Sequence, residues 1–144
     1  MHSAQALASA TASETRKAVR LDHSVVAPAR RFVALPADSN PSGDIFGGWI
    51  LSQMDLAGSA HAFKRLKRRV VTVGIEAMSF HKPVFIGDDV AFYTEIFKIG
   101  RTSITIKIES WAFRRSGEGY VKVTEGLFTY VQIDDNRKPV PIAP

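Results

Sequence analysis

A carboxylate and a glycine pair stand close together in residues 40–55, which read NPSGDIFGGWILSQMD. Turn-forming residues open this segment, and a run of good helix formers follows Gly47 and Gly48. Glycines at a helix start leave backbone N–H groups accessible to an anion or a developing oxyanion. Asp55 follows two turns later. The spacing predicts a hydrolytic site, and the alternative is a tight loop followed by an ordinary helix.

Composition excludes several classes of chemistry. The 144 residues are 45% hydrophobic and 23% charged, which is typical of one globular domain. Cysteine is missing, so thiolate catalysis, disulfides and cysteine-based metal sites are excluded, and the four histidines lack the spacing of metal ligands. No apolar run is long enough to span a membrane, and we expect a cytoplasmic protein. The formal charge of +5 favours acidic partners.

The chain divides into a tail and one domain. Residues 1–27, rich in Ala, Ser and Thr, are interpreted as a flexible N-terminal tail, and a loose similarity to an organellar transit peptide is the alternative. Residues 28–144 are predicted to form the domain. Its predicted elements are a strand at 30–35, a helix at 47–66, and strands at 70–80, 89–99, 102–113 and 120–133.

Consecutive long strands joined by short turns predict an antiparallel sheet that curls around the helix. Five residues of the last strand are expected to share one face: Val121, Val123, Leu127, Thr129 and Val131. One helix covers only one face of such a sheet. We therefore expect a second subunit to cover part of the remainder.

Four segments together resemble the YciA-type bacterial acyl-CoA thioesterases: NPSGDIFGGWILSQMD, VVTVGIEAMSFHKPVFIGD, GRTSITIKIESW and KVTEGLFTYVQID. The resemblance extends over about residues 30 to 139. It implies an α+β hotdog fold, with an antiparallel sheet wrapped around one long central helix. It also implies hydrolysis of acyl-CoA to CoA and a carboxylic acid, with no cofactor because CoA is part of the substrate and product. A homodimer with active sites at its interface, assembled further into a hexamer, is implied as well.

The resemblance assigns catalytic roles to residues of the first segment. Asp55 falls on the catalytic carboxylate of the family, and acts either as a general base on water or as a nucleophile that forms a mixed anhydride. Gly47 and Gly48 are expected to polarise the thioester carbonyl through their amides. Asn40 either orients the water or the carbonyl, or caps its own turn. This loop departs from the family pattern, since Pro-Ser follows Asn40 where Ala and Asn are usual.

Substrate-binding residues are expected in three other places. The resemblance associates the turn of Arg101, Thr102 and Ser103 with the CoA nucleotide, and a guanidinium in such a turn suits a phosphate. Lys82 is a further candidate contact. By resemblance alone, Thr72 reaches the site from the partner subunit.

Three remaining features are predicted to be structural or auxiliary. Asp44 is expected to cap the helix. The basic run at 64–69, KRLKRR, is interpreted as a solvated helix end that can add electrostatic attraction for CoA. His61 and His81 are expected to be structural.

Three other functions compete with thioester hydrolysis. A hotdog dehydratase acting on hydroxyacyl thioesters needs a histidine with an acid partner, and no histidine lies in the turn or the early helix. A non-catalytic acyl-CoA-binding or sensing module would keep the CoA contacts but needs no carboxylate at Asp55. Nucleic-acid binding depends on the basic run at 64–69 alone. The acyl-CoA thioesterase remains the main prediction.

Overall fold

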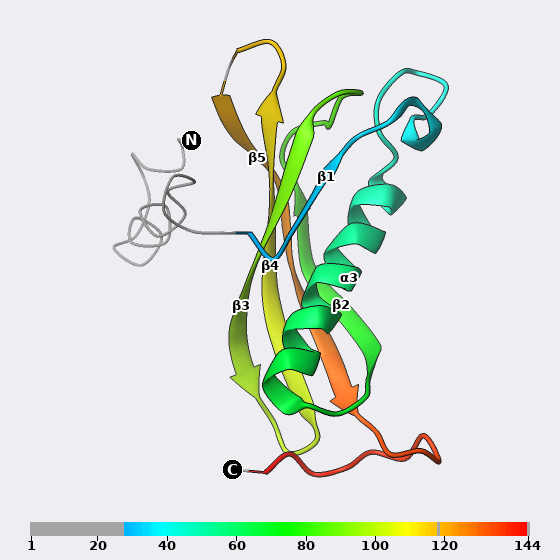
Figure 1. The fold of residues 1–144 in the computed structure, drawn as a ribbon, viewed down its shortest axis with the longest axis vertical. Helices are drawn as coiled ribbons and strands as arrows, with labels where there is room; N and C mark the ends of the chain where they lie inside the picture. The colour runs from blue at the N-terminus through cyan, green and yellow to red at the C-terminus, as the bar shows by residue number, and fades with distance from the viewer. Residues whose placement is uncertain (1–27, 118, 144) are drawn as a thin grey trace.

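The computed structural model describes residues 28–117 and 119–143, and the expected N-terminal tail lies outside them. One long helix, α3, lies in the curve of a five-stranded antiparallel sheet (Figure 1). The elements are β1 (Arg30–Val33), the short 3-10 helix η1 (Pro36–Asp38), α3 (Gly47–Leu66), β2 (Val70–Phe80), β3 (Asp89–Ile99), β4 (Ser103–Arg114) and β5 (Gly119–Gln132). The strand order is β1-β3-β4-β5-β2. The expected fold class is confirmed, as are the helix and strand ranges to within two residues at each end.

Small side chains let α3 approach the sheet closely. Its buried positions recur every three or four residues, and are Ile50, Met54, Ala57, Gly58 and Ala62. A Cβ atom added to Gly58 would lie 2.6 Å from Cδ1 of Ile108 in β4. The helix ends at Leu66, and the next residue, Lys67, caps it with a left-handed backbone (φ 59°) and donates its N–H to the Phe63 carbonyl. Within the described ranges no helix is long and apolar enough to cross a membrane.

The start of α3 has no side-chain cap. Phe46 occupies the N-cap position, so the prediction that Asp44 caps the helix is wrong. Asp44 lies two residues too early, and its backbone instead forms an antiparallel bridge with Phe85 and a hydrogen bond to Asn40. The first amides of the helix therefore lack the carboxylate partner that a capping Asp44 would supply.

A bulge in β5 changes which face its side chains occupy. The register between β4 and β5 shifts after Ser110, where Trp111 lies opposite Lys122. Val121 pairs with the core residue Ala112, and Val123 is fully buried. The expectation that Val121 and Val123 share a face with Leu127, Thr129 and Val131 is therefore wrong, because the bulge interrupts the alternation between them.

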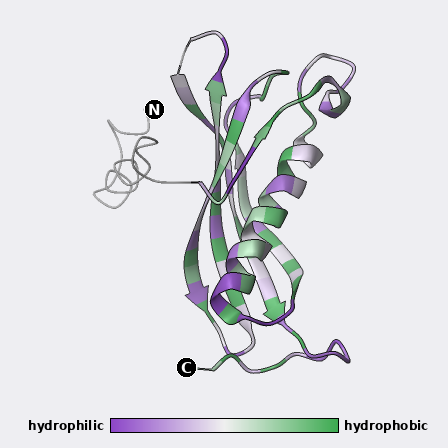
Figure 2. Ribbon diagram, viewed as in Figure 1, coloured by the Kyte–Doolittle hydropathy of each residue, from purple (hydrophilic) through white to green (hydrophobic). Residues whose placement is uncertain are grey.

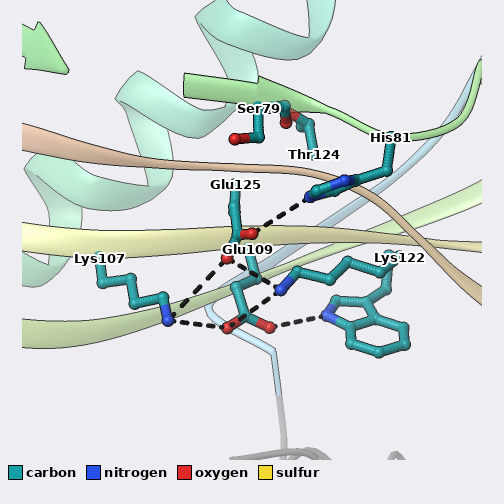
Figure 3. Close-up of polar contacts among 8 residues, drawn as sticks. Ser79, His81, Lys107, Glu109, Lys122, Thr124 and Glu125 are labelled. Carbon is teal, nitrogen blue, oxygen red and sulfur yellow. Dashed lines mark hydrogen bonds and ion pairs between the residues drawn. The ribbon is translucent and has the colours of Figure 1, made fainter. Parts of the chain in front are cut away.

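Charged side chains form a network on the face of the sheet opposite α3 (Figure 3). Glu125 of β5 accepts a hydrogen bond from Lys122 at 2.8 Å and contacts His81, just after β2, at 3.1 Å. Glu109 of β4 is 3.5 Å from Lys107 and 3.9 Å from Lys122. Two lysines thus balance two carboxylates and connect β4, β5 and the end of β2.

Candidate active site

Asp55 lies half-buried in the middle of α3, and one of its carboxylate oxygens is held by two donors. Oδ1 accepts a hydrogen bond from the Thr72 hydroxyl at 2.8 Å and from the Tyr130 phenol at 3.1 Å. Oδ2 accepts no hydrogen bond from any residue of the described chain. The carboxylate is therefore fixed through one oxygen and leaves the other available for chemistry.

The two donors come from neighbouring strands. Thr72 of β2 and Tyr130 of β5 are paired directly across the antiparallel ladder, so both side chains project toward α3. Thr72 thus reaches Asp55 of its own chain, in contrast to the expected contact from a partner subunit. Tyr130 was not expected in the site, because an aromatic residue in a strand of alternating apolar and polar residues usually indicates core packing.

Burial determines the protonation of Tyr130. The side chain is fully buried, and this burial, together with the neighbouring Asp55 carboxylate, raises the pKa of its phenol above the usual value. The phenol therefore stays protonated and remains a hydrogen-bond donor to Asp55.

Gly47 and Gly48 are the first two residues of α3, and both are exposed. Neither amide donates to an acceptor within the described part of the chain. A Cβ atom at Gly48 would meet nothing within 4 Å, and one at Gly47 would meet only the Phe80 ring, at 3.6 Å. The helix start thus presents unsatisfied donors at the positive end of the helix dipole.

Asn40 organises the turn that leads to the helix. Its side-chain oxygen accepts the N–H groups of Ser42 at 2.9 Å and Asp44 at 3.1 Å. Gly43 completes the turn with φ +91°, a conformation that favours glycine. These hydrogen bonds match the turn-capping role expected for Asn40, and its role in orienting the water or the carbonyl stays a prediction.

Arg101 and Thr102 lie at the opposite end of the molecule from the helix start, in the turn between β3 and β4, and Ser103 is the first residue of β4 (Figure 1). The Thr102 carbonyl accepts the N–H of Gln132, and the carbonyl of Arg69 accepts the N–H of the next residue, Ile133. This turn and the basic run at 64–69 therefore flank the same end of β5. Figure 2 shows the hydrophilic colouring of the loop that follows α3 at this end.

The other sequence candidates lie away from Asp55. Lys82 is exposed beyond the end of β2 and donates its backbone N–H to Val123. His61 contacts Thr94 of β3 at 2.8 Å, and burial together with the charge of Lys64 lowers the pKa of its imidazole. His81 contacts Glu125 on the outer face. Neither histidine touches Asp55, as expected for structural residues.

Comparisons with known proteins identify the family. The family model for the thioesterase superfamily matches residues 42–116. The acyl-CoA thioester hydrolase YciA of Salmonella typhimurium is 48% identical over 116 residues, which cover 78% of this chain and 86% of that protein.

Solved structures are similar as well. Cj0915, a hexameric hotdog fold thioesterase of Campylobacter jejuni, matches with a TM-score of 0.77 at 42% identity, covering 82% of this chain and 91% of that one. HI0827, a hexameric broad specificity acyl-coenzyme A thioesterase, matches with a TM-score of 0.76 at 42% identity, covering 82% of each chain. The chain has the hotdog fold and belongs to the thioesterase superfamily.

Proposed function

We propose that this protein hydrolyses acyl-CoA thioesters, releasing CoA and a carboxylic acid, with Asp55 as the catalytic carboxylate. The observation that carries the proposal is the Asp55 side chain, held through Oδ1 by Thr72 and Tyr130 with Oδ2 left without a partner among the described residues. Membership of the thioesterase superfamily and the similarity to the YciA hydrolase of Salmonella typhimurium support the substrate class.

Two routes are compatible with a carboxylate at this position. As a general base, Asp55 takes a proton from water while the water oxygen attacks the carbonyl carbon, and the C–S bond breaks as the thiolate leaves. As a nucleophile, Asp55 displaces the thiolate to form a mixed anhydride that water then hydrolyses. Label found in Asp55 after single-turnover hydrolysis in ¹⁸O-labelled water would establish the anhydride route, because only attack of water on the Asp55 carbonyl of the anhydride places it there.

The spacing along α3 supports an active site shared between two copies of the chain. Gly48 and Asp55 are separated along the helix axis by about 10 Å at a rise of 1.5 Å per residue. The amide donors must lie about 3 Å from the thioester carbonyl oxygen, and the attacking atom must lie about 3 Å from the carbonyl carbon. One chain does not bring its own helix start and its own carboxylate to the same thioester, so the proposed oxyanion donors, Gly47 and Gly48, come from a second copy.

The free edge of β2 is the proposed surface for that second copy. Among the described strands, β2 pairs with β5 alone, so its other edge has no strand partner in that part of the chain. Val73 and Ile75 of this strand and Leu56 of α3 are exposed apolar side chains. An exposed apolar edge strand is a template for pairing with another chain. A homodimer formed here, assembled further into a hexamer as in the solved relatives, is part of the proposal.

The CoA part of the substrate carries phosphate groups, and the proposed contacts for them are Arg101, Thr102, Ser103 and Lys82. Arg101 is exposed in its turn and close in sequence to two hydroxyls, an arrangement suited to a phosphate. The basic run at 64–69 lies at the same end of the molecule and adds positive potential there.

A panel of acyl-CoA substrates from acetyl to palmitoyl tests the function. Thiol release is followed for the wild type, Asp55→Asn and Asp55→Ala, and circular dichroism establishes that each variant is folded. We expect activity to fall about 100-fold or more in both variants, because each removes the charged carboxylate. A wild type that binds acyl-CoA but releases no thiol from any substrate would instead identify a binding module.

A further inference from the structure

The Tyr130 phenol touches Asp55 at two points. Its oxygen is 3.1 Å from Oδ1 of the carboxylate and 3.1 Å from the backbone carbonyl of the same residue. A phenol has one hydrogen to donate, so the two acceptors share it. The contact therefore ties the side chain of Asp55 to its own stretch of helix backbone, and restricts rotation of the carboxylate.

Gly58 creates the space that this contact requires. It lies one turn after Asp55 on the buried side of α3, and an added Cβ atom would be 2.3 Å from the Tyr130 oxygen. Any other residue at this position would displace the phenol or the helix. The glycine and the tyrosine thus form one arrangement, in which β5 places a hydroxyl beneath the helix.

A fully buried phenol needs an acceptor, and here the acceptor is the proposed catalytic group. Hydrogen bonds to a charged partner are stronger and geometrically more specific than bonds between neutral groups. Thr72 donates to the same oxygen at 2.8 Å. Two donors on Oδ1 fix the plane of the carboxylate, so the direction of Oδ2 is set by the protein.

We propose that Tyr130 is a positioning residue that, with the space provided by Gly58, orients Asp55 so that Oδ2 faces the reacting carbonyl or its attacking water. This inference rests on the proposed function, since it assigns Tyr130 a role through the Asp55 carboxylate. Tyr130 is assigned no contact with substrate.

The test is Tyr130→Phe, which removes only the hydroxyl. We expect kcat for acyl-CoA hydrolysis to fall about 10- to 100-fold, because a misoriented carboxylate loses the near-attack geometry, while KM stays within about twofold. In an Asp55→Ala background the same substitution should change the residual rate by less than about twofold, since its effect passes through the carboxylate.

Tyr93→Phe, which removes another buried tyrosine hydroxyl on the opposite face of the sheet, is the matched control and should keep wild-type kcat.

Gly58→Ala gives a second route to the same result, because its methyl group pushes the phenol away. Unfolding in urea is measured for every variant, so that loss of folded protein is separated from loss of rate. A folded Tyr130→Phe enzyme with wild-type kcat would overturn the inference while leaving the proposed function intact, provided that Asp55→Ala is inactive. An Asp55→Ala enzyme with wild-type activity would overturn both.

Discussion

Gly48 lies at the start of α3, and no contact among the described residues explains why this position lacks a side chain. A Cβ atom there would meet nothing within 4 Å, whereas one at Gly58 would collide with the Tyr130 phenol. Glycine weakens a helix relative to alanine because it has more backbone freedom to lose on folding. A substrate carbonyl that approaches the exposed amides of Gly47 and Gly48 would account for the glycine.

Replacing this glycine should separate stability from activity. We expect Gly48→Ala to raise the free energy of unfolding by about 0.5 kcal/mol, because alanine is the better helix former. We also expect kcat/KM for acyl-CoA to fall about tenfold, since the methyl group obstructs the approach to the amide. Urea unfolding and thiol-release kinetics measure the two effects. Gly58→Ala should show the opposite change in stability, and a Gly48→Ala enzyme with wild-type kinetics would argue against an oxyanion role.

Charged side chains connect neighbouring strands on the outer face of the sheet. Burial alone would raise the pKa of Glu125, but hydrogen bonds from Lys122 and His81 and the charge of Lys107 outweigh burial and lower it. A carboxylate with a lowered pKa stabilises the folded state only while it is ionised. The connection between β5 and its neighbours should therefore weaken in acid.

Glu125→Gln measures this contribution. At pH 7 we expect the variant to lose about 1 kcal/mol of unfolding free energy, because its neutral amide removes one of the two carboxylates that face Lys107 and Lys122. The pKa of Glu125 is lower in the folded than in the unfolded state, so the difference between wild type and variant should shrink as the pH falls below about 4. Glu76→Gln is the control, since Glu76 is exposed and has no ion pair among the described residues. A difference that grows in acid would contradict this assignment.

Three parts of the proposed site follow one another along the length of α3. The glycine amides lie at the start of α3, Asp55 in its middle, and the basic run at 64–69 with Arg101 at its far end. Under the proposed function, a thioester that contacts both Asp55 and a pair of glycine amides lies between two helices from two chains, and assembly is a condition for activity.

Mixing two inactive variants tests this condition. In a dimer of Asp55→Ala and Gly48→Val chains, one site combines the intact glycines of the first chain with the intact carboxylate of the second. Random reassociation should restore about a quarter of the wild-type activity, since half of the dimers are mixed and each has one intact site of two. Each variant reassociated alone is the control. Mixtures that stay inactive, although mass measurements show mixed dimers, would place the whole site within one chain.

Much of the fold follows from local pattern. The glycine pair and the helix formers after it predict α3, and alternating β-branched residues predict the four long strands, because helix and strand periodicity depend on near neighbours. The same pattern predicts Asp55 as a candidate catalytic carboxylate and places it two turns from the helix start. The β5 bulge and the helix cap at Phe46 escape such reasoning, since both depend on which backbone groups pair with distant strands.

The environment of Asp55, by contrast, depends on contacts between residues far apart in the chain. Tyr130 is 75 residues from Asp55 and reads in sequence as an ordinary core aromatic. It becomes a donor to the carboxylate only because β5 passes beneath α3 at Gly58, beside the Thr72 that β2 supplies. Periodicity specifies which face of a strand is buried, but the partner that a buried hydroxyl meets is set by how sheet and helix pack.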